Sequence, residues 1–145
     1  MTADLDFVRV RNWFDKESFM DFAEICEYTK YSKMASARDK FFHGEHHFLL
    51  YTERAHFYKR FAIKGVRHLV FYQPPHYPRF FSEICNFMQA AYQNKKASGG
   101  SENMSCTVIY CKYDVARVNA IAGSDRAKTM LTSDKSVHMF DTGKT

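Results

Sequence analysis

Residues 47–72 read HFLLYTERAHFYKRFAIKGVRHLVFY, and two apolar runs in this stretch flank a basic, aromatic segment. The first run, 47–52, is dominated by apolar residues, which is typical of a strand buried on both faces of a sheet. The second run, 67–72, has the same character. Helical patterns precede and follow these runs along the chain. The sequence therefore predicts an α/β fold with a mostly parallel sheet flanked by helices.

Apolar spacing places the other elements around these two strands. We expect helices over 4–16 and 32–44, the latter with Ser32 as its cap and Gly44 as its end. A third helix opens at Pro78 and carries an apolar stripe of Phe81, Ile84, Cys85, Met88 and Tyr92. Asp114 caps a helix that runs through Ala122, and a second helical piece follows Gly123-Ser124. Further strands are expected over 22–28, 105–111 and 136–140.

The 145 residues predict a single domain, 1–145, with one flexible internal loop over 93–103, QNKKASGGSEN. A parallel sheet of this kind normally begins with a strand that leads into its first helix. The sequence ahead of the helix at 4–16 is too short and polar for a buried strand. We therefore expect a sheet without its first strand, which another segment or another molecule would complete.

The four cysteines, Cys26, Cys85, Cys106 and Cys111, show no C-x-x-C spacing, so neither a zinc ribbon nor a redox motif is indicated. We expect four reduced, mostly buried thiols. Cys106 and Cys111 are expected on one strand, pointing to opposite faces. No run of 18 apolar residues is present, so the sequence predicts no contact with a membrane.

Enzyme chemistry finds no support in the residues alone. The tail ends in Gly143-Lys144-Thr145, but a phosphate-binding loop also needs a glycine at position 138, which is His138, and a following helix. His43, His46 and His47 could ligate zinc, although a polar turn fits their spacing better. No nucleophile with an evident base appears. We therefore expect no cofactor and no metal.

The basic segment carries the candidate site. The net charge is +5, and positive residues concentrate between the two central strands. Arg54, Lys59, Arg60, Lys64 and Arg67 could neutralise phosphates, while His56, Phe57 and Tyr58 could stack on bases. Polar residues after a parallel strand also lie at the carboxyl edge of the sheet, where open α/β folds bind ligands. The same composition suits packing against a protein partner, and both interpretations stay open.

Several strings along the chain resemble the C-terminal region of the digestive organ expansion factor family. They are DFVRVRNWF (6–14), ICEYT (25–29), ARDKFFHG (37–44), the central stretch over 48–72, YPRFFSEICNF (77–87), CTVIYCKYD (106–114) and the segment 125–140. That family comprises nucleolar proteins of the small-subunit processome, its component 25, associated with small nucleolar RNA. The resemblance implies a RecA-like domain related to the second domain of DEAD-box RNA helicases. It also implies a strand, a first RecA-like domain and an acidic region ahead of the part seen here.

In active helicases, the region similar to Leu49–Arg60 contacts RNA and nucleotide, and a later motif, H-R-x-G-R-x-G-R, supplies arginines that stabilise the transferring phosphoryl group. Here HYPRFFSEICNF occupies that place and keeps Arg79 without the paired arginines and the glycines. The resemblance therefore implies a non-catalytic scaffold in the nucleus and nucleolus. Its partners would be pre-ribosomal RNA, small nucleolar ribonucleoprotein and processome assembly proteins, and its role 18S precursor processing. The alternatives are the second motor domain of an ATP-dependent RNA helicase, and a basic interaction domain with no ribosomal role.

Overall fold

A computed structural model describes residues 2–17, 20–93 and 104–141. The chain runs through α1 (Thr2–Lys16), β1 (Phe22–Ile25), α2 (Tyr31–His43), β2 (Phe48–Tyr51), α3 (Glu53–Lys59), β3 (His68–Phe71), α4 (Pro78–Gln93), β4 (Ser105–Val108), α5 (Val115–Ala122) and α6 (Ser124–Thr132). The α/β prediction is confirmed. The predicted loop at 93–103 lies, after Gln93, outside the described residues.

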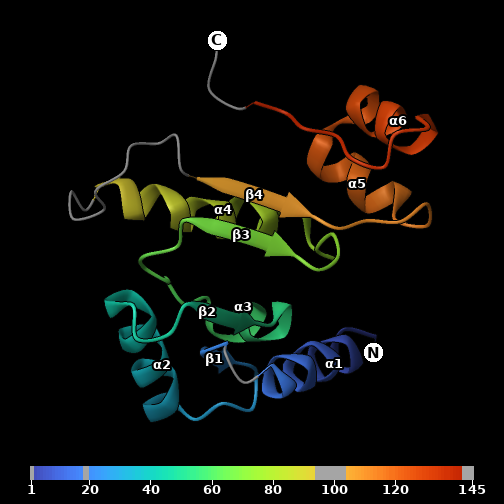
Figure 1. The fold of residues 1–145 in the computed structure, drawn as a ribbon. Coiled ribbons are helices and arrows are strands. Elements are labelled where there is room, and N and C mark those ends of the chain that lie inside the picture. The colour runs from blue at the N-terminus through green and yellow to red at the C-terminus, as the bar shows by residue number, and fades with distance from the viewer. Residues whose placement is uncertain (1, 18–19, 94–103, 142–145) are drawn as a thin grey trace.

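The described strands form two parallel pairs, β1–β2 and β3–β4, where the sequence predicted one sheet. In the first pair Phe22 lies opposite Phe48, and in the second His68 lies opposite Ser105. Figure 1 shows the β3–β4 pair with α4 behind it, and the β1–β2 pair below it beside α2 and α3. The RecA-like arrangement stays a prediction.

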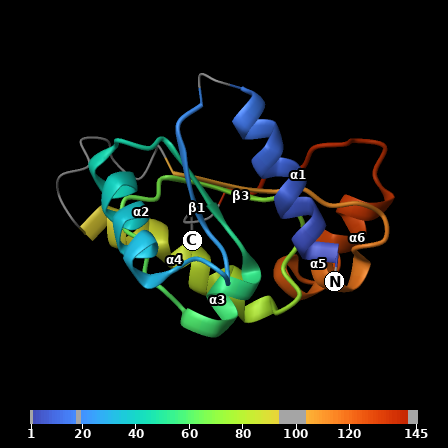
Figure 2. The same ribbon diagram turned by 90° about the horizontal axis from the view of Figure 1, so that it is seen from below.

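The molecule has two halves, one around the β1–β2 pair and one around the β3–β4 pair, and each half has its own buried side chains. In the first half, Ala23 and Ile25 of β1 pack with Met34 and Ala37 of α2 and with Ala55 of α3. α1 joins this half through Phe14, whose ring meets those of Phe22 and Phe48 edge-on at 5.4 and 5.3 Å. In the second half Phe80 of α4, Val118 of α5 and Ala127 of α6 are buried. Figure 2 shows α2 and the α5–α6 pair at opposite ends of the molecule.

The strands are shorter and less buried than expected. β1 ends at Ile25 because a turn follows, in which Thr29 donates its backbone N–H to the Cys26 carbonyl and receives the Cys26 N–H on its hydroxyl. Neither central strand is buried on both faces: Phe48 of β2 is exposed, and β3 alternates between exposed and half-buried side chains. Among the described residues each strand has one hydrogen-bonded neighbour, so helices and strands cover it only in part.

Some expected ends and caps were wrong. Helix α2 begins at Tyr31, so its N-cap residue is Lys30, two positions ahead of the expected Ser32. Gly44 does end the helix, in a left-handed conformation with φ 79°. Asp114 precedes α5, but its carboxylate accepts the N–H of Cys111 and makes no cap bond to the helix. Residues 136–140 form no strand. Local competition for the same backbone groups explains such shifts.

Two expectations about the thiols were also wrong. Strand β4 ends at Val108, so Cys111 lies beyond the strand that holds Cys106. Cys106 and Cys111 are exposed, whereas Cys26 and Cys85 are half-buried. The reason is that β4 is an edge strand in the described structure, and its side chains have little covering them.

Candidate nucleic-acid interface

The segment after β2 folds into the short helix α3, which the sequence did not predict. Thr52 caps it, since its Oγ1 accepts the backbone N–H of Ala55 at 3.1 Å. Glu53 occupies the first turn, where a negative charge suits the helix dipole. The helix ends at Arg60, whose N–H donates to the His56 carbonyl at 2.9 Å and whose φ is 40°. Capping and a left-handed end thus place 53–60 compactly after the strand.

Glu53 joins this helix to the segment that follows β3. One carboxylate oxygen, Oε1, accepts the backbone N–H groups of His76 and Tyr77 at 2.8 and 3.1 Å, and Oε2 accepts from His76 Nδ1 at 3.0 Å. His76 Nε2 in turn accepts from the Arg117 guanidinium of α5 at 2.9 Å. The segments after the carboxyl ends of β2 and β3 therefore meet, as expected of a ligand-binding edge.

Three exposed aromatic rings gather where these segments meet. Phe57 of α3 stacks on Tyr77 with ring centroids 5.6 Å apart and planes at 26°, and it meets Tyr58 edge-on at 5.3 Å. Phe57, Tyr58 and Tyr77 are 45%, 63% and 46% exposed. Rings that stay this exposed in a folded domain offer contact area to a ligand.

Two arginines pack against the same buried ring as Phe57 and Tyr77. The guanidinium carbons of Arg60 and Arg79 lie 5.8 and 5.6 Å from the centroid of the same ring, that of buried Phe80. Tyr77 packs on Phe80 as well, at 5.0 Å. We call the exposed group formed by Phe57, Tyr58, Arg60, Tyr77 and Arg79 the arginine–aromatic patch. Its chemistry, cationic groups beside flat rings, suits phosphates and bases.

The prediction that His56 stacks on a base was wrong, because His56 is only 2% exposed. Its Nε2 donates to Glu83 of α4 at 2.7 Å, and in the uncharged ring Nδ1 accepts from the Tyr51 hydroxyl at 3.0 Å. Phe80 lies edge-on to it at 4.8 Å. Both ring nitrogens are thus occupied, and His56 ties β2, α3 and α4 together beneath the patch. The hydrogen bonds to Tyr51 and Glu83 favour the burial of His56, and the residues next to it in the sequence did not indicate them.

The pKa values of Glu83 and Tyr51, the two partners of His56, shift in opposite directions and for different reasons. The hydrogen bond from His56 lowers the pKa of Glu83, and the nearby guanidinium groups of Arg60 and Arg79 add to the effect. Burial raises the pKa of the Tyr51 hydroxyl well above its usual range. Glu83 also lies 4.0 Å from the Arg60 guanidinium. This carboxylate therefore helps to position the Arg60 guanidinium within the patch.

The remaining predicted cations do not join the patch. Arg54 pairs with Glu27, Nε to Oε1, at 3.6 Å. The ammonium of Lys59 lies 4.4 Å from the Tyr31 ring centroid and 3.9 Å from Met34 Sδ, so it faces α2. Lys64 and Arg67 are exposed, but Arg67 lies at the amino end of β3, whereas Tyr77 follows its carboxyl end. The structure thus divides the predicted set and retains Phe57, Tyr58 and Arg60.

The structure adds two residues, Tyr77 and Arg79, that the sequence did not point to as RNA contacts. They lie 20 and 22 positions beyond Phe57, and the Glu53 bonds, the Phe57–Tyr77 stacking and the His56–Glu83 hydrogen bond bring their segment to α3. The signal that could have found them is Tyr77-Pro78-Arg79 at a helix start directly after a strand. In the predicted fold, that position lies at the same sheet edge.

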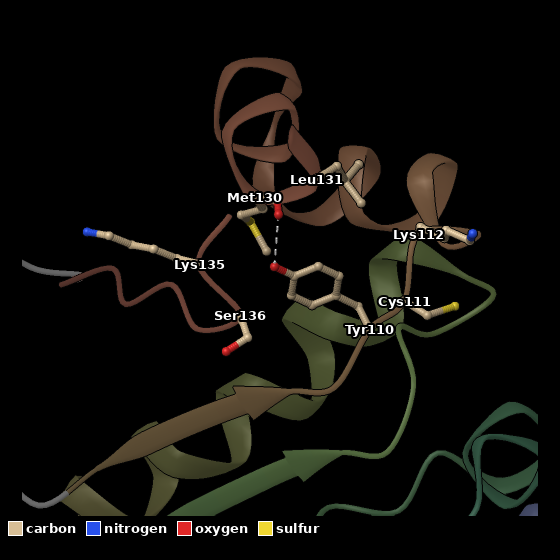
Figure 3. A pocket seen from close by; sticks show the side chains of 7 residues that line it. All are labelled: Tyr110, Cys111, Lys112, Met130, Leu131, Lys135 and Ser136. Carbon is tan, nitrogen blue, oxygen red and sulfur yellow. Dashed lines mark hydrogen bonds between the residues drawn. The ribbon is translucent and has the colours of Figure 1, made fainter. Parts of the chain in front are cut away.

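A hollow away from the arginine–aromatic patch lies around Tyr110, between the exit of β4 and α6 (Figure 3). The Tyr110 hydroxyl donates to the Met130 carbonyl at 3.3 Å, and the side chains of Lys112 and Lys135 extend away from it in opposite directions (Figure 3). No converging charge marks it as a binding site. The described residues hold no metal-binding group of His, Cys, Asp or Glu, and none of their helices is long and apolar enough to cross a membrane.

The chain is similar over most of its length to curated proteins from animals, fungi and plants. The human protein named U3 small nucleolar RNA-associated protein 25 homolog is 51% identical over 139 residues, which is 96% of this chain and 18% of the relative. The protein named U3 small nucleolar RNA-associated protein 25 from Schizosaccharomyces japonicus is 35% identical over 93% of this chain and 21% of its own. Protein NUCLEOLAR FACTOR 1 from Arabidopsis thaliana is 35% identical over 93% of this chain and 17% of its own.

The chain therefore spans about a fifth of the length of these curated relatives. It also matches the family described as "Utp25, C-terminal domain" over residues 2–140. Because that match covers almost the whole sequence, this chain belongs to the Utp25 family and corresponds to its C-terminal domain.

Proposed function

We propose that this chain is the C-terminal domain of a nucleolar protein of the small-subunit processome that acts in 18S precursor processing. Its role there is non-catalytic, as a surface that binds RNA and assembly proteins. The names of the relatives, which refer to association with U3 small nucleolar RNA and to a nucleolar factor, support this proposal. Shared ancestry over nearly the full chain makes a shared partner the simplest expectation.

The arginine–aromatic patch carries the RNA part of the proposal. Single-stranded RNA is bound by stacking bases on exposed rings while cations neutralise the phosphates, and a stacked base contributes about 1–3 kcal/mol. Phe57 and Tyr77 already stack on each other at 5.6 Å, and both pack against the ring of Phe80, whose centroid lies 5.8 and 5.6 Å from the guanidinium carbons of Arg60 and Arg79. A base added next to either ring would therefore lie within reach of a guanidinium.

Fluorescence anisotropy with a labelled single-stranded segment of U3 small nucleolar RNA tests the patch. We compare the chain with a double variant, Arg60→Ala with Arg79→Ala, at several salt concentrations. Losing two phosphate contacts should weaken binding at least tenfold at low salt and flatten the dependence of log affinity on log salt by about 0.7 per contact. A Phe57→Leu and Tyr77→Leu pair should weaken binding without changing that slope, because it removes stacking and no charge.

The matched control is Arg9→Ala with Lys128→Ala, which removes the same charge from the exposed surfaces of α1 and α6. If this control weakens binding as much as the patch variant, the attraction is general and the chain is a basic interaction domain. If the folded chain binds neither this RNA nor an unrelated strand, the RNA role is refuted. A pull-down of 18S precursor RNA and processome proteins by the full-length relative then tests the assembly role separately.

Arg79 supports a second candidate function, the second motor domain of an ATP-dependent RNA helicase. Its guanidinium lies 5.6 Å from the centroid of the Phe80 ring, near the meeting point of the segments after β2 and β3, where a phosphate-stabilising arginine would be needed. ATP turnover by a full-length relative, with and without RNA, decides between the two. RNA-stimulated turnover that falls by about 10³-fold or more in Arg79→Ala would replace the scaffold role with a motor role.

A further inference from the structure

Two thiols from different elements lie side by side in the second half of the molecule. Cys85 is on α4 and Cys106 is on β4, and their Sγ atoms are 3.9 Å apart. Cys85 is half-buried and Cys106 is exposed. The two residues are 21 positions apart in the sequence, and their spacing alone indicated no pairing. This contact was created by the packing of α4 on the β3–β4 pair, where Phe81 lies 5.2 Å from Phe71.

The distance between these thiols suits bond formation. A disulfide joins its sulfurs at about 2.05 Å, so the two Sγ atoms must approach by roughly 2 Å. Rotation about the side-chain torsions of the exposed Cys106 supplies such a shift. Neither helix α4 nor strand β4 would have to separate from the other. The remaining cysteines have other surroundings: Cys26 Sγ lies 3.3 Å from Thr29 Oγ1, and Cys111 is exposed beyond the strand.

The two thiols differ in acidity because of their contact. The Cys85 thiol donates a hydrogen bond to Cys106 Sγ, which lowers the pKa of Cys106. The same bond, together with burial, raises the pKa of Cys85. Thiolates are the reactive form of cysteine, and reactive cysteines are partly exposed. Cys106 therefore has the position and the acidity of an attacking thiol, and Cys85 those of a resolving one.

We propose that Cys85 and Cys106 form a dithiol site that is oxidised by hydroperoxides to an intramolecular disulfide. In the first step the Cys106 thiolate attacks the hydroxyl oxygen of the hydroperoxide and the O–O bond breaks. The other oxygen departs as alkoxide, or as hydroxide from hydrogen peroxide, and Cys106 becomes a sulfenic acid. Cys85 then attacks the Cys106 sulfur, the S–O bond breaks, and the Cys85 proton and the departing hydroxide form water. Each sulfur loses one electron, the peroxide gains two, and a thiol reductant reverses the change.

The disulfide would fasten α4 to β4. Helix α4 also carries Arg79 and Glu83, two residues at or beneath the arginine–aromatic patch. A crosslink between Cys85 and Cys106 closes a loop of the intervening chain and reduces the freedom of the unfolded state. Oxidation should therefore raise the unfolding temperature of the chain by several degrees. The dithiol site rests on geometry of its own and does not depend on the proposed RNA role.

The test uses the full 145-residue chain, fully reduced and then treated with a small excess of hydrogen peroxide. Peptide mapping under non-reducing conditions should find one crosslinked pair, containing Cys85 and Cys106, and the loss of two hydrogen atoms. Cys111→Ser should leave that crosslink intact, whereas Cys85→Ser should abolish it. In Cys85→Ser, a dione probe for sulfenic acid should label Cys106 several times faster than it labels Cys111. Circular dichroism of each variant checks that the fold is retained.

Three results would overturn the proposal. One is a folded, peroxide-treated chain in which Cys85 and Cys106 remain unlinked while Cys111 is oxidised. Another is a crosslink that forms only between separate chains, which would mean that the contact within the chain is not used. The third is equal labelling of Cys106 and Cys111 in Cys85→Ser, where a hydroxyl replaces the thiol as hydrogen-bond donor, which would show that a hydrogen bond from position 85 does not set the reactivity of Cys106.

Discussion

At the scale of single residues, Arg60 stands out by its backbone. Among the described residues it is the one non-glycine position with a positive φ, 40°. A side chain in this left-handed region costs on the order of 1 kcal/mol, and such positions concentrate at functional sites. Its guanidinium lies beside Phe80 and 4.0 Å from Glu83. The end of helix α3 requires this backbone conformation. The presence of arginine there, instead of glycine, is explained if the guanidinium binds a ligand.

This interpretation predicts a separation of stability from binding. Arg60→Gly should be more stable than Arg60→Ala by up to about 1 kcal/mol, because glycine adopts φ 40° without a steric penalty. Both variants should lose RNA affinity equally, since both lack the guanidinium. Urea unfolding and RNA anisotropy measure the two effects. Normal RNA affinity in Arg60→Gly would mean that the backbone shape matters and the charge does not.

His56 illustrates a different kind of dependence, that of a buried polar group on its partners. His56→Leu removes the hydrogen bonds to Tyr51 and Glu83 and leaves the Tyr51 hydroxyl without that partner. We expect a loss of about 2–3 kcal/mol in the free energy of unfolding, measured in urea. His43→Leu is the control, since His43 is an exposed histidine of α2 and should change stability by less than about 0.5 kcal/mol. Similar losses of stability in both variants would show that His56 stabilises the fold no more than an exposed histidine does.

The lowered pKa of Glu83 predicts a dependence of stability on pH. A carboxylate whose pKa is lower in the folded state contributes stability above its unfolded pKa, and this contribution is lost as pH falls through the folded pKa. The free energy of unfolding should therefore fall as pH drops below about 4.5, and it should fall less steeply in Glu83→Gln. Urea titrations between pH 3 and pH 7 measure both slopes. Parallel curves would show that the contact with His56 does not favour the ionised form.

At the scale of elements, two glycines end or connect the helices at left-handed positions. Gly44 closes α2 with φ 79°, and its N–H donates to carbonyls of the last turn. Gly65 lies between α3 and β3 with φ 85°. A Cβ at Gly44 would meet nothing within 4 Å, whereas one at Gly65 would lie 3.4 Å from Phe42 Cδ2. Both sites thus require a left-handed backbone, but a side chain would have a close neighbour only at Gly65.

Gly44→Ala should cost about 1 kcal/mol, from its backbone conformation alone. Gly65→Ala should cost at least as much, because it has the same backbone conformation to adopt and its Cβ would lie only 3.4 Å from Phe42 Cδ2, at the close end of van der Waals contact. Gly44→Asn should cost less than Gly44→Ala, since asparagine tolerates the left-handed region. Urea unfolding of the three variants provides the comparison. An alanine at Gly65 that is cheaper than one at Gly44 would contradict the assigned crowding.

At the scale of the whole molecule, the two strand pairs are the main feature. Each of β2 and β3 hydrogen-bonds to one partner strand in the described structure, so each presents one edge without a strand. Such edges are normally paired or covered. We expect one more parallel strand to join the two pairs into a single sheet, as the resemblance to RecA-like domains implies.

The longer relatives allow this expectation to be tested. The matching region of the human relative, prepared with the residues ahead of it, should unfold in urea with a higher free energy and a steeper slope than the region alone. The reason is that the slope grows with the surface exposed on unfolding. An extension of the same composition in scrambled order is the control. If the natural extension stabilises no more than the scrambled one, the added strand comes from elsewhere or does not exist.

Periodicity and turn residues sufficed to predict the α/β class, the parallel direction of the strands, and the helices at 4–16 and from Pro78, because these depend on neighbours in the sequence. The family could likewise be predicted, since residue strings carry ancestry. Tertiary contacts decided the rest. Glu53 brought Tyr77 and Arg79 to Phe57, Tyr51 and Glu83 drew His56 inwards, and helix packing placed Cys85 beside Cys106. Sequence patterns record which face of an element is apolar, but contacts between distant segments depend on how those elements pack, and no local pattern contains that.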